Sequence, residues 1–366
     1  MSWLSDWSHR IPITIDHTKI DEDLTHFPIP IVLSSGTTTA SGIFNELGFN
    51  SKKIAITQDD GQTQLYGEIE FWDSTACSGV IWTSSSGITI ASGTDTDIYL
   101  YYDSTKSDNT TYIGDIGDSA AQNVWNSNFA GVWHLSQDPS TGGACILDST
   151  SNEKHGTTNG SMTSDDLIDG PIGKALEFDG SDDYIDLGGF SEIENISQLS
   201  VQAISKITTF DGNYEHYFGS FDDWDNYLNF SCYPSDERPI FIVKNGGSGS
   251  AATTVNNSIL LNTWAYIHGT FNNGNSAMYL GGDQKDTYSS GPSTTSTLSN
   301  NFAIGAWSSE NLSNNTHDGP ISEVRVLTTE LSSAWVKADY YAQTDNLLTY
   351  GSEEVHSFSE VIGTIR

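Results

Sequence analysis

Short runs of alternating hydrophobic and polar residues, many of them rich in β-branched side chains, follow one another along most of the chain. Runs of this kind, separated by turn residues, are typical of the strands of β-sandwiches. In the first third of the chain they cover residues 11–15, 28–33, 53–57, 67–72, 79–83 and 98–102. Helical periodicity is nearly absent, and we expect only short helices near residues 41–47 and 332–342. The pattern therefore predicts an all-β protein.

The alternation stops at residues 104–126, where Asp, Ser, Thr, Asn and Gly predominate. A second series of strands follows at residues 131–135, 175–179, 183–187, 199–207, 227–233, 239–243, 264–271, 277–280, 301–306 and 321–327. Because typical domains hold about 100–200 residues, we predict two jelly-roll-like β-sandwich domains. They cover residues 1–125 and 126–350, with a C-terminal extension at residues 351–366. Segments 245–254 and 287–299, rich in Gly, Ser and Thr, are expected to be mobile connections.

The chain is strongly acidic, with 14 Lys and Arg against 48 Asp and Glu and a formal net charge of -34. This charge repels phosphate backbones, so we expect no nucleic-acid partner. No stretch approaches the ~20 apolar residues of a membrane span, so we expect no membrane insertion. The start of the sequence lacks the basic and apolar regions of a signal peptide. That leaves a processed chain, a trimmed chain, or a structural protein released by lysis, such as part of a virion.

Five phrases in the second region occur in a fixed order. They are GVWHLSQ (131–137), DSTSNEKHGT (148–157), GKALEFDGSDDYIDLG (173–188), TWAYIHGTF (263–271) and DGPISEVRVLTTELS (318–332). Together they resemble the concanavalin A-like, laminin-G-type superfamily over roughly residues 129–350. The resemblance implies a jelly-roll of two antiparallel sheets, often with a calcium ion and with glycan or protein ligands.

The opening phrase WLSDWSHRIPITIDHTKIDEDLTHFPIPIVL, followed by EIEFW and IYLYY, resembles an uncharacterised β-rich domain. That domain commonly precedes laminin-G-like modules in bacterial and archaeal surface proteins and in phage structural proteins. The pairing implies adhesion or virion assembly rather than metabolism.

A structural calcium site is one expectation from the resemblance. Asp148 and Asn152 lie in the phrase that resembles the family's metal loop, and Asp179 and Asp318 are further candidate ligands. Calcium prefers six to eight oxygen ligands, which such loops supply. The alternative is that these side chains cap turns. The sequence also departs from the family pattern, with Ser322 and Gly281 where acidic residues are usual, so the site is expected to be reduced.

A candidate sugar-binding segment, YEHYFGSFDDWDNYLNF, covers residues 214–230. Sugar recognition needs an aromatic platform with polar groups beside it. The predicted carbohydrate-binding residues are Trp224, Tyr227, Asp222, Asp223 and Tyr214, and Trp307 is a second possible platform. In the alternative interpretation the segment is a sandwich edge, with Tyr217, Phe218, Tyr227 and Phe230 facing inward.

The sharpest catalytic signal is the pair Glu68 and Glu70 in GEIEFWD. Residues two apart in a strand share a face about 6.5–7 Å apart, and paired carboxylates can hydrolyse glycosides. The segment faintly resembles the catalytic strand of laminarinase-type hydrolases, although it lies in the first domain. The histidines show neither HxH nor HExxH spacing, so no zinc site is indicated. We therefore expect a protein without catalytic residues.

The leading prediction is a non-catalytic glycan-binding or adhesion protein. We place it on a phage particle, as a tail, fibre or capsid-decorating protein, or on a prokaryotic surface, and thus at a virion surface or outside the cell. Weak single sites need many copies, so the expected partners are cell-surface or extracellular glycans, other copies of the chain, and virion or surface-assembly proteins. The alternatives are a purely structural virion or filament protein, and a glycoside hydrolase that uses Glu68 and Glu70.

Overall fold

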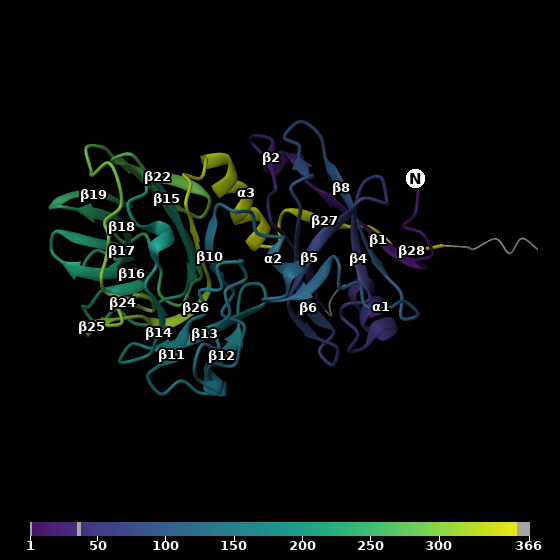
Figure 1. Cartoon of the computed structure of the whole chain (residues 1–366), viewed down its shortest axis with the longest axis horizontal. Helices are drawn as coiled ribbons and strands as arrows, with labels where there is room; N and C mark the ends of the chain where they lie inside the picture. Colours follow the sequence, from purple (N-terminus) through teal and green to yellow (C-terminus); the bar gives the residue numbers. More distant parts are fainter. Residues whose placement is uncertain (1, 35–37, 357–366) are drawn as a thin grey trace, which may run out of the picture.

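The computed structural model describes residues 2–34 and 38–356. Its strands form two lobes that lie end to end (Figure 1). The lobe drawn in purple and blue is the N-terminal domain, and the lobe drawn in teal and green is a sandwich of two sheets. The predicted all-β class is confirmed. In the part of the chain that is described, no helix is long and apolar enough to cross a membrane.

The N-terminal domain is built on a nine-stranded sheet with the order β27-β1-β8-β4-β5-β6-β3, to which β28 and β9 are added beside β1 and β5. Its strands are β1 (His9–Ile15), β3 (Ile29–Leu33), β4 (Ile54–Gln58), β5 (Gln64–Asp73), β6 (Ser78–Ser84), β8 (Thr96–Tyr102), β9 (Ile113–Asp115), β27 (Leu348–Tyr350) and β28 (Glu354–Val355), and β2 (Leu24–Thr25) pairs separately with β7 (Thr89–Ile90). The strands at the two ends of this order, β27 and β3, approach each other. The Val32 amide of β3 donates to the Tyr350 hydroxyl of β27 at 2.9 Å. The sheet therefore curls around an isoleucine-rich core.

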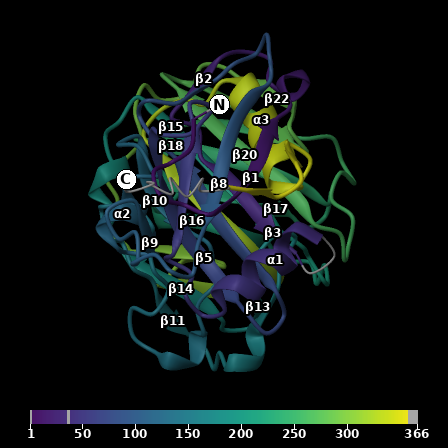
Figure 2. The same ribbon diagram turned by 90° about the vertical axis from the view of Figure 1, so that its right-hand side faces the viewer.

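Within the described residues, three α-helices accompany the sheets: α1 (Thr38–Leu47), α2 (Ser119–Gln122) and α3 (Ser333–Gln343). The first and third confirm the predicted helices. Ser332 caps α3, since its hydroxyl accepts the Trp335 amide at 3.1 Å. Ala338 and Ala342 of α3 pack into the N-terminal core. The end-on view in Figure 2 shows α3 (yellow) in the upper part of the molecule, and after α3 the chain returns to the N-terminal domain through β27.

The sandwich pairs an eight-stranded sheet, β12-β13-β26-β15-β20-β21-β22 with β10 beside β26, with a seven-stranded sheet, β11-β14-β23-β16-β17-β18-β19. The strands of the first are β10 (Phe129–Trp133), β12 (Leu167–Asp169), β13 (Lys174–Asp179), β15 (Gln198–Ser205), β20 (Ala265–Asn272), β21 (Asn275–Leu280), β22 (Asp283–Tyr288) and β26 (Asp318–Leu327). Those of the second are β11 (Thr157–Asn159), β14 (Tyr184–Gly188), β16 (Glu215–Asp223), β17 (Asn226–Tyr233), β18 (Arg238–Asn245), β19 (Ser248–Thr253) and β23 (Phe302–Ile304). A hairpin of β24 (Ala306–Ser308) and β25 (Asn311–Thr316) follows β23.

Residues 348–355 contribute two strands to the first sheet, and residues 357–366 lie outside the described residues. We placed residues up to 350 in the second domain and treated residues 351–366 as an extension, yet β27 and β28 both pair with β1. These strands cover an edge of β1 that would otherwise expose unpaired backbone groups. The predicted boundary at residues 125 and 126 falls between α2 and β10 and stays a prediction.

The prediction of a mobile connection at residues 245–254 is wrong, because β19 occupies most of that segment. Its inward positions are small, and Ser250 and Ala252 are buried at the edge of the sheet. Small residues give a weak strand signal because they carry neither β-branching nor bulk.

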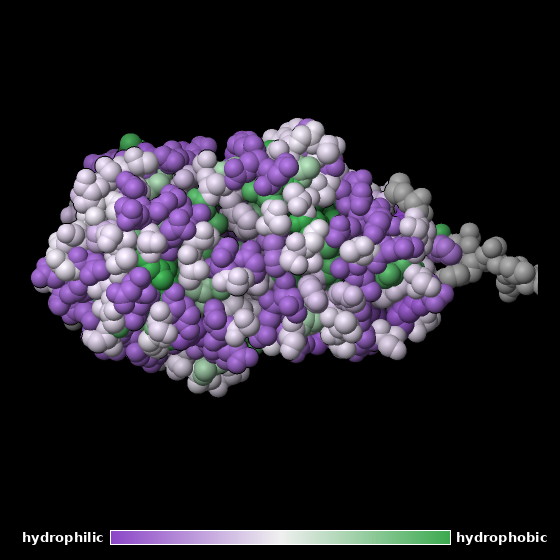
Figure 3. Space-filling model, turned by 45° about the horizontal axis from the view of Figure 1, so that its top comes forward, coloured by the Kyte–Doolittle hydropathy of each residue, from purple (hydrophilic) through white to green (hydrophobic). Residues whose placement is uncertain are grey.

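Figure 3 shows a mostly hydrophilic face across both lobes, with only small, separated hydrophobic spots. This surface agrees with the acidic composition.

Candidate functional site

Aromatic side chains cover part of the outer face of the seven-stranded sheet. Neighbouring residues in a regular strand point to opposite faces, but a bulge between His216 and Phe218 lets both Tyr217 and Phe218 of β16 enter the core. Phe230 of β17 packs into the core as well. Phe221 and Tyr227 are half-buried and lie on the outer face. The inward-facing alternative thus describes Tyr217, Phe218 and Phe230, but not Tyr227.

Trp224 stands at the turn between β16 and β17 with 70% of its surface exposed. Its ring meets the edges of Phe221 and Trp307 at centroid distances of 5.3 and 5.8 Å. Trp307, from β24, is nearly buried, and its ring centroid lies 4.2 Å from that of Phe221 and 5.6 Å from that of Tyr227. We call Phe221, Trp224, Tyr227 and Trp307 the aromatic cluster. It presents one exposed indole on a base of fixed rings.

The two predicted carboxylates hold the loops around this cluster. Asp222 accepts hydrogen bonds from the Ser299 and Asn300 amides at 2.8 Å each. Asp223 accepts from the Asp225 amide at 2.8 Å, which closes the turn that carries Trp224. The structure therefore places both carboxylates beside the cluster with their oxygens engaged by backbone.

Tyr214 lies at the far end of the same face. Its ring is 5.0 Å from Tyr233 and 5.7 Å from His216, and His216 stacks on Trp307 at 5.4 Å. A row of rings thus joins Tyr214 to Trp224 through a buried middle. Sequence reasoning did not select Phe221 or His216 for this face.

Glu68 and Glu70 lie between the two lobes, and Glu68 does not reach the surface. Glu68 is fully buried, and its Oε1 is 2.8 Å from His134 Nε2. Glu70 accepts a hydrogen bond from Trp82 Nε1 at 2.8 Å. The hydrolase alternative required both carboxylates to line a cleft open to substrate, and the burial of Glu68 does not meet that requirement.

A second arrangement has the connectivity of a hydrolase triad. Ser205 Oγ is 2.9 Å from His317 Nε2, and His317 Nδ1 is 3.5 Å from Glu215 Oε2. All three residues are at most 1% exposed, so a substrate could not reach the hydroxyl. Burial also lowers the pKa of His317 to about 3. This triad belongs to the core.

The four predicted calcium ligands occupy two separate places. Asp148 is buried and accepts hydrogen bonds from the Val132, Thr150 and Lys154 amides at 2.9–3.0 Å. Asn152 donates to the Ala130 carbonyl at 3.0 Å. These contacts are the turn-capping role that was the alternative, and they leave the Asp148 carboxylate already surrounded by donors.

Asp179 and Asp318 face each other across β13 and β26. Asp148 bonds the Val132 amide, and Val132 pairs with Arg325 of β26. Arg325 is seven residues along β26 from Asp318, and seven residues of a strand span roughly 23 Å. One ion cannot bridge both places. However, the carboxylates of Asp179, Asp182 and Asp183 form a group of three whose ligand oxygens lie within 4.8 Å of one another.

The architecture agrees with a sequence comparison, in which residues 179–337 match the family model of the concanavalin A-like lectin/glucanases superfamily. The sandwich is a concanavalin A-like domain. The matched region starts at the end of β13 and runs into α3, so it includes the aromatic cluster of the concanavalin A-like domain. No match was found among curated proteins.

Solved structures are similar to part of this chain at low identity. One is domain 4 of AbnA, an extracellular GH43 arabinanase from Geobacillus stearothermophilus, in complex with arabinotriose (19% identity, TM-score 0.45, 60% of this chain and 98% of that chain). Others are the binding domain of Paraclostridial Mosquitocidal Protein 1 (14%, TM-score 0.46, 59% and 52%) and that of botulinum neurotoxin DC in complex with SialylT (14%, TM-score 0.43, 59% and 52%). This chain thus spans about half the length of the two toxin chains.

Proposed function

We propose that the concanavalin A-like domain binds glycans through the aromatic cluster, with Trp224 as the stacking platform. The observation that carries this proposal is the exposure of Trp224, at 70%, on top of the nearly buried Trp307. Covering a large exposed ring with the apolar face of a pyranose removes apolar surface from water and so favours binding. The rings beneath it hold the indole in place, which lowers the entropy lost on binding.

Polar groups surround the platform and supply partners for sugar hydroxyls. The Lys244 ammonium lies 5.5 Å over the Tyr227 ring. The amide of Asn226 and the carboxylate of Asp225 belong to the turn that carries Trp224. Such a mixture of one platform and a few polar groups is the usual composition of a sugar site.

We propose binding without hydrolysis, because the paired carboxylates that hydrolysis would need are engaged in the junction between the lobes. An adhesive role at a virion or cell surface, with many copies acting together, follows as part of the same proposal, since single sites of this kind are weak.

The proposal is tested by a glycan array with the purified chain, its Trp224→Ala variant and a Phe49→Ala control. Phe49 is 87% exposed but lies in the N-terminal domain. We expect glycan binding in the wild type and the control, and loss in Trp224→Ala. Binding that survives in Trp224→Ala would place the site elsewhere, and no binding by any form would favour a purely structural assembly protein.

Calcium at Asp179, Asp182 and Asp183 is a separate proposal that rests on the family resemblance and on the spacing of these carboxylates. Burial, together with the charge of Asp179, raises the pKa of Asp183 to about 6. A cation would relieve this repulsion and stabilise the folded state by mass action, by about 2.7 kcal/mol at a hundredfold excess over its Kd.

We therefore expect millimolar calcium to raise the unfolding temperature of the wild type by a few degrees, measured by calorimetry against a chelator. Asp183→Asn should lose this shift, whereas Asp59→Asn, at an exposed position of the N-terminal domain, should keep it. An equal shift in both variants would argue against this site.

A further inference from the structure

Seven ionisable side chains meet in the buried junction between the two lobes. Glu68 and Glu70 come from β5 of the N-terminal domain. On the other side, His134 directly follows β10, Glu323 and Arg325 come from β26, His268 from β20 and Asp339 from α3. Each of them is at most 9% exposed. We call these seven residues the charge cluster.

Hydrogen bonds connect the charge cluster across the junction. His134 bridges the lobes, with Nε2 at 2.8 Å from Glu68 and Nδ1 at 2.8 Å from Glu323. Arg325 continues the chain to Glu323 at 2.6 Å and to Asp339 at 3.1 Å. Asp339 in turn lies 3.1 Å from His268 Nε2.

Apolar side chains from both lobes enclose the charge cluster. Trp82 of β6 stacks on His134 at 5.4 Å, and the Arg325 guanidinium lies 4.4 Å from the same indole. Trp125 packs beside Trp82, with ring centroids 5.6 Å apart, and lies 5.5 Å from His134. In such an environment unbalanced charges are costly, because little water screens them.

The charges of the cluster do not balance when every acid is ionised. Four carboxylates, those of Glu68, Glu70, Glu323 and Asp339, face Arg325 and two histidines. Glu68 Oε2 has no hydrogen-bond partner in the described residues, and Glu70 is held only through Trp82 and the more distant His134 at 3.8 Å. A proton on one of these two glutamates reduces the excess negative charge.

We propose that the charge cluster is a proton-dependent lock, by which we mean that its hydrogen bonds and ion pairs hold the N-terminal domain against the concanavalin A-like domain. The lock is strongest when a junction glutamate carries a proton and His134 is cationic. It weakens as the pH rises. The N-terminal domain thereby acts as an intramolecular partner of the eight-stranded sheet, and the seven-stranded sheet with its aromatic cluster stays free.

The direction of the pH effect follows from the groups that face Glu70. Burial, with the charges of Glu323 and Glu68, raises the pKa of Glu70 to about 7, against the opposing imidazolium of His134. Between its ordinary value of 4.5 and about 7, the docked state therefore holds a proton that a separated state has lost. Docking is then favoured at the lower end of this window and weakens as the pH rises through it.

His134 acts in the same direction. Burial alone would lower the pKa of His134, but the carboxylates of Glu323, Glu68 and Glu70 raise it to about 10. The stabilisation that His134 gives the junction is fully present below its ordinary pKa of 6.5 and is lost as the pH rises toward 10. Both groups thus make the junction weaker on the alkaline side.

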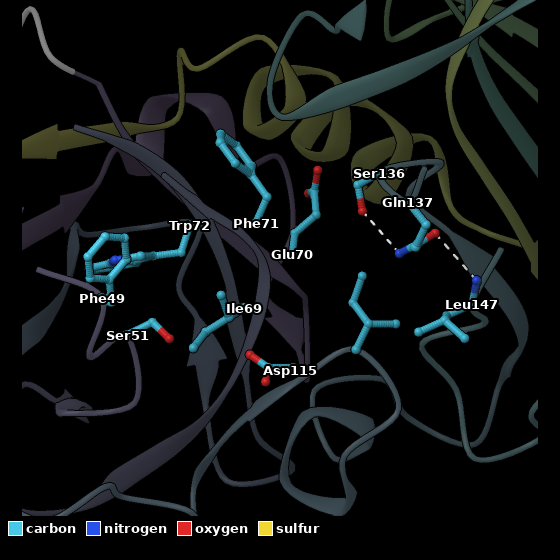
Figure 4. A pocket seen from close by; sticks show the side chains of 11 residues that line it. Phe49, Ser51, Ile69, Glu70, Phe71, Trp72, Asp115, Ser136, Gln137 and Leu147 are labelled. Atoms are coloured by element: carbon cyan, nitrogen blue, oxygen red, sulfur yellow. Dashed lines mark hydrogen bonds between the residues drawn. The ribbon is translucent and has the colours of Figure 1, made fainter. Parts of the chain in front are cut away.

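Solvent can reach the lock from one side. Glu70 is among the residues that line a groove of about 400 Å³ between the lobes. Figure 4 shows Glu70 and Phe71 on one wall of this groove and Ser136, Gln137 and Leu147 on the other. The groove gives protons a route to Glu70 without separation of the lobes.

The test is hydrogen exchange of the full chain between pH 5.5 and pH 8, corrected for intrinsic exchange, with small-angle scattering as a measure of lobe separation. We expect the protection of β5 and β26 in the wild type to fall by about tenfold or more over this range. Glu70→Gln keeps an acceptor for Trp82 but cannot ionise, so it should lose clearly less protection than the wild type, because only the contribution of His134 still falls over this range. Glu153→Gln, at an exposed position, should behave as the wild type does.

Equal loss of protection in the wild type and Glu70→Gln, or no loss in either, would overturn the proposal. If Glu70→Gln does not fold, the wild type still decides. Loss at β5 and β26 before β17, in the sheet away from the junction, supports the lock, and simultaneous loss in all three strands contradicts it.

Discussion

Arg325→Ala is expected to lower the free energy of unfolding by about 3–5 kcal/mol, because it leaves two buried carboxylates without their cation. The guanidinium is 2% exposed and bonds Glu323 and Asp339 at 2.6 and 3.1 Å. It also packs against Trp82, so the change removes apolar contact as well. Urea unfolding followed by far-ultraviolet circular dichroism measures the loss.

Lys337→Ala is the matched control. Lys337 pairs with Asp21 at 2.8 Å at the surface, where ion pairs contribute about 0–1 kcal/mol. Similar losses in the two variants would show that the junction charges contribute no more than surface pairs do.

Phe218→Ala is expected to cost about 3–5 kcal/mol, the usual range for deletion of a fully buried ring. Phe218 has no exposed surface and stacks on Phe302 at a centroid distance of 5.5 Å. The ring centroids of Trp133 and Phe190 lie 6.5 and 6.4 Å from that of Phe218. Because these neighbours are themselves packed, they cannot readily move to fill the cavity that the substitution leaves.

The same measurement on Phe49→Ala should show a change below about 0.5 kcal/mol, as expected for an exposed position. A small loss in Phe218→Ala would mean that the core of the concanavalin A-like domain can repack, contrary to the close packing that the structure shows.

Much of the fold could be predicted from alternation alone. Runs such as residues 98–102 and 227–233 lie within β8 and β17, where β-branched and aromatic residues favour strands. The return of β27 to β1 could not be predicted, since pairing partners far apart in sequence leave no local pattern. The small residues of β19 also hid a strand.

The aromatic site was predicted in part. Trp224 stood out because a large ring between acidic residues is poorly explained as core. Phe221 was missed because a bulge between His216 and Phe218 shifts the alternation of β16 by one residue. The pairing of Glu68 with His134 could not be predicted either, because His134 comes from the other lobe.

The most direct test of glycan binding through Trp224 is a calorimetric titration of the best array glycan into the wild type, Trp224→Ala and Trp224→Phe. Stacking on an exposed ring implies a Kd at least about tenfold weaker in Trp224→Ala, or about 1.4 kcal/mol, with most of the affinity retained in Trp224→Phe. Equal affinity in all three forms would contradict the proposed site.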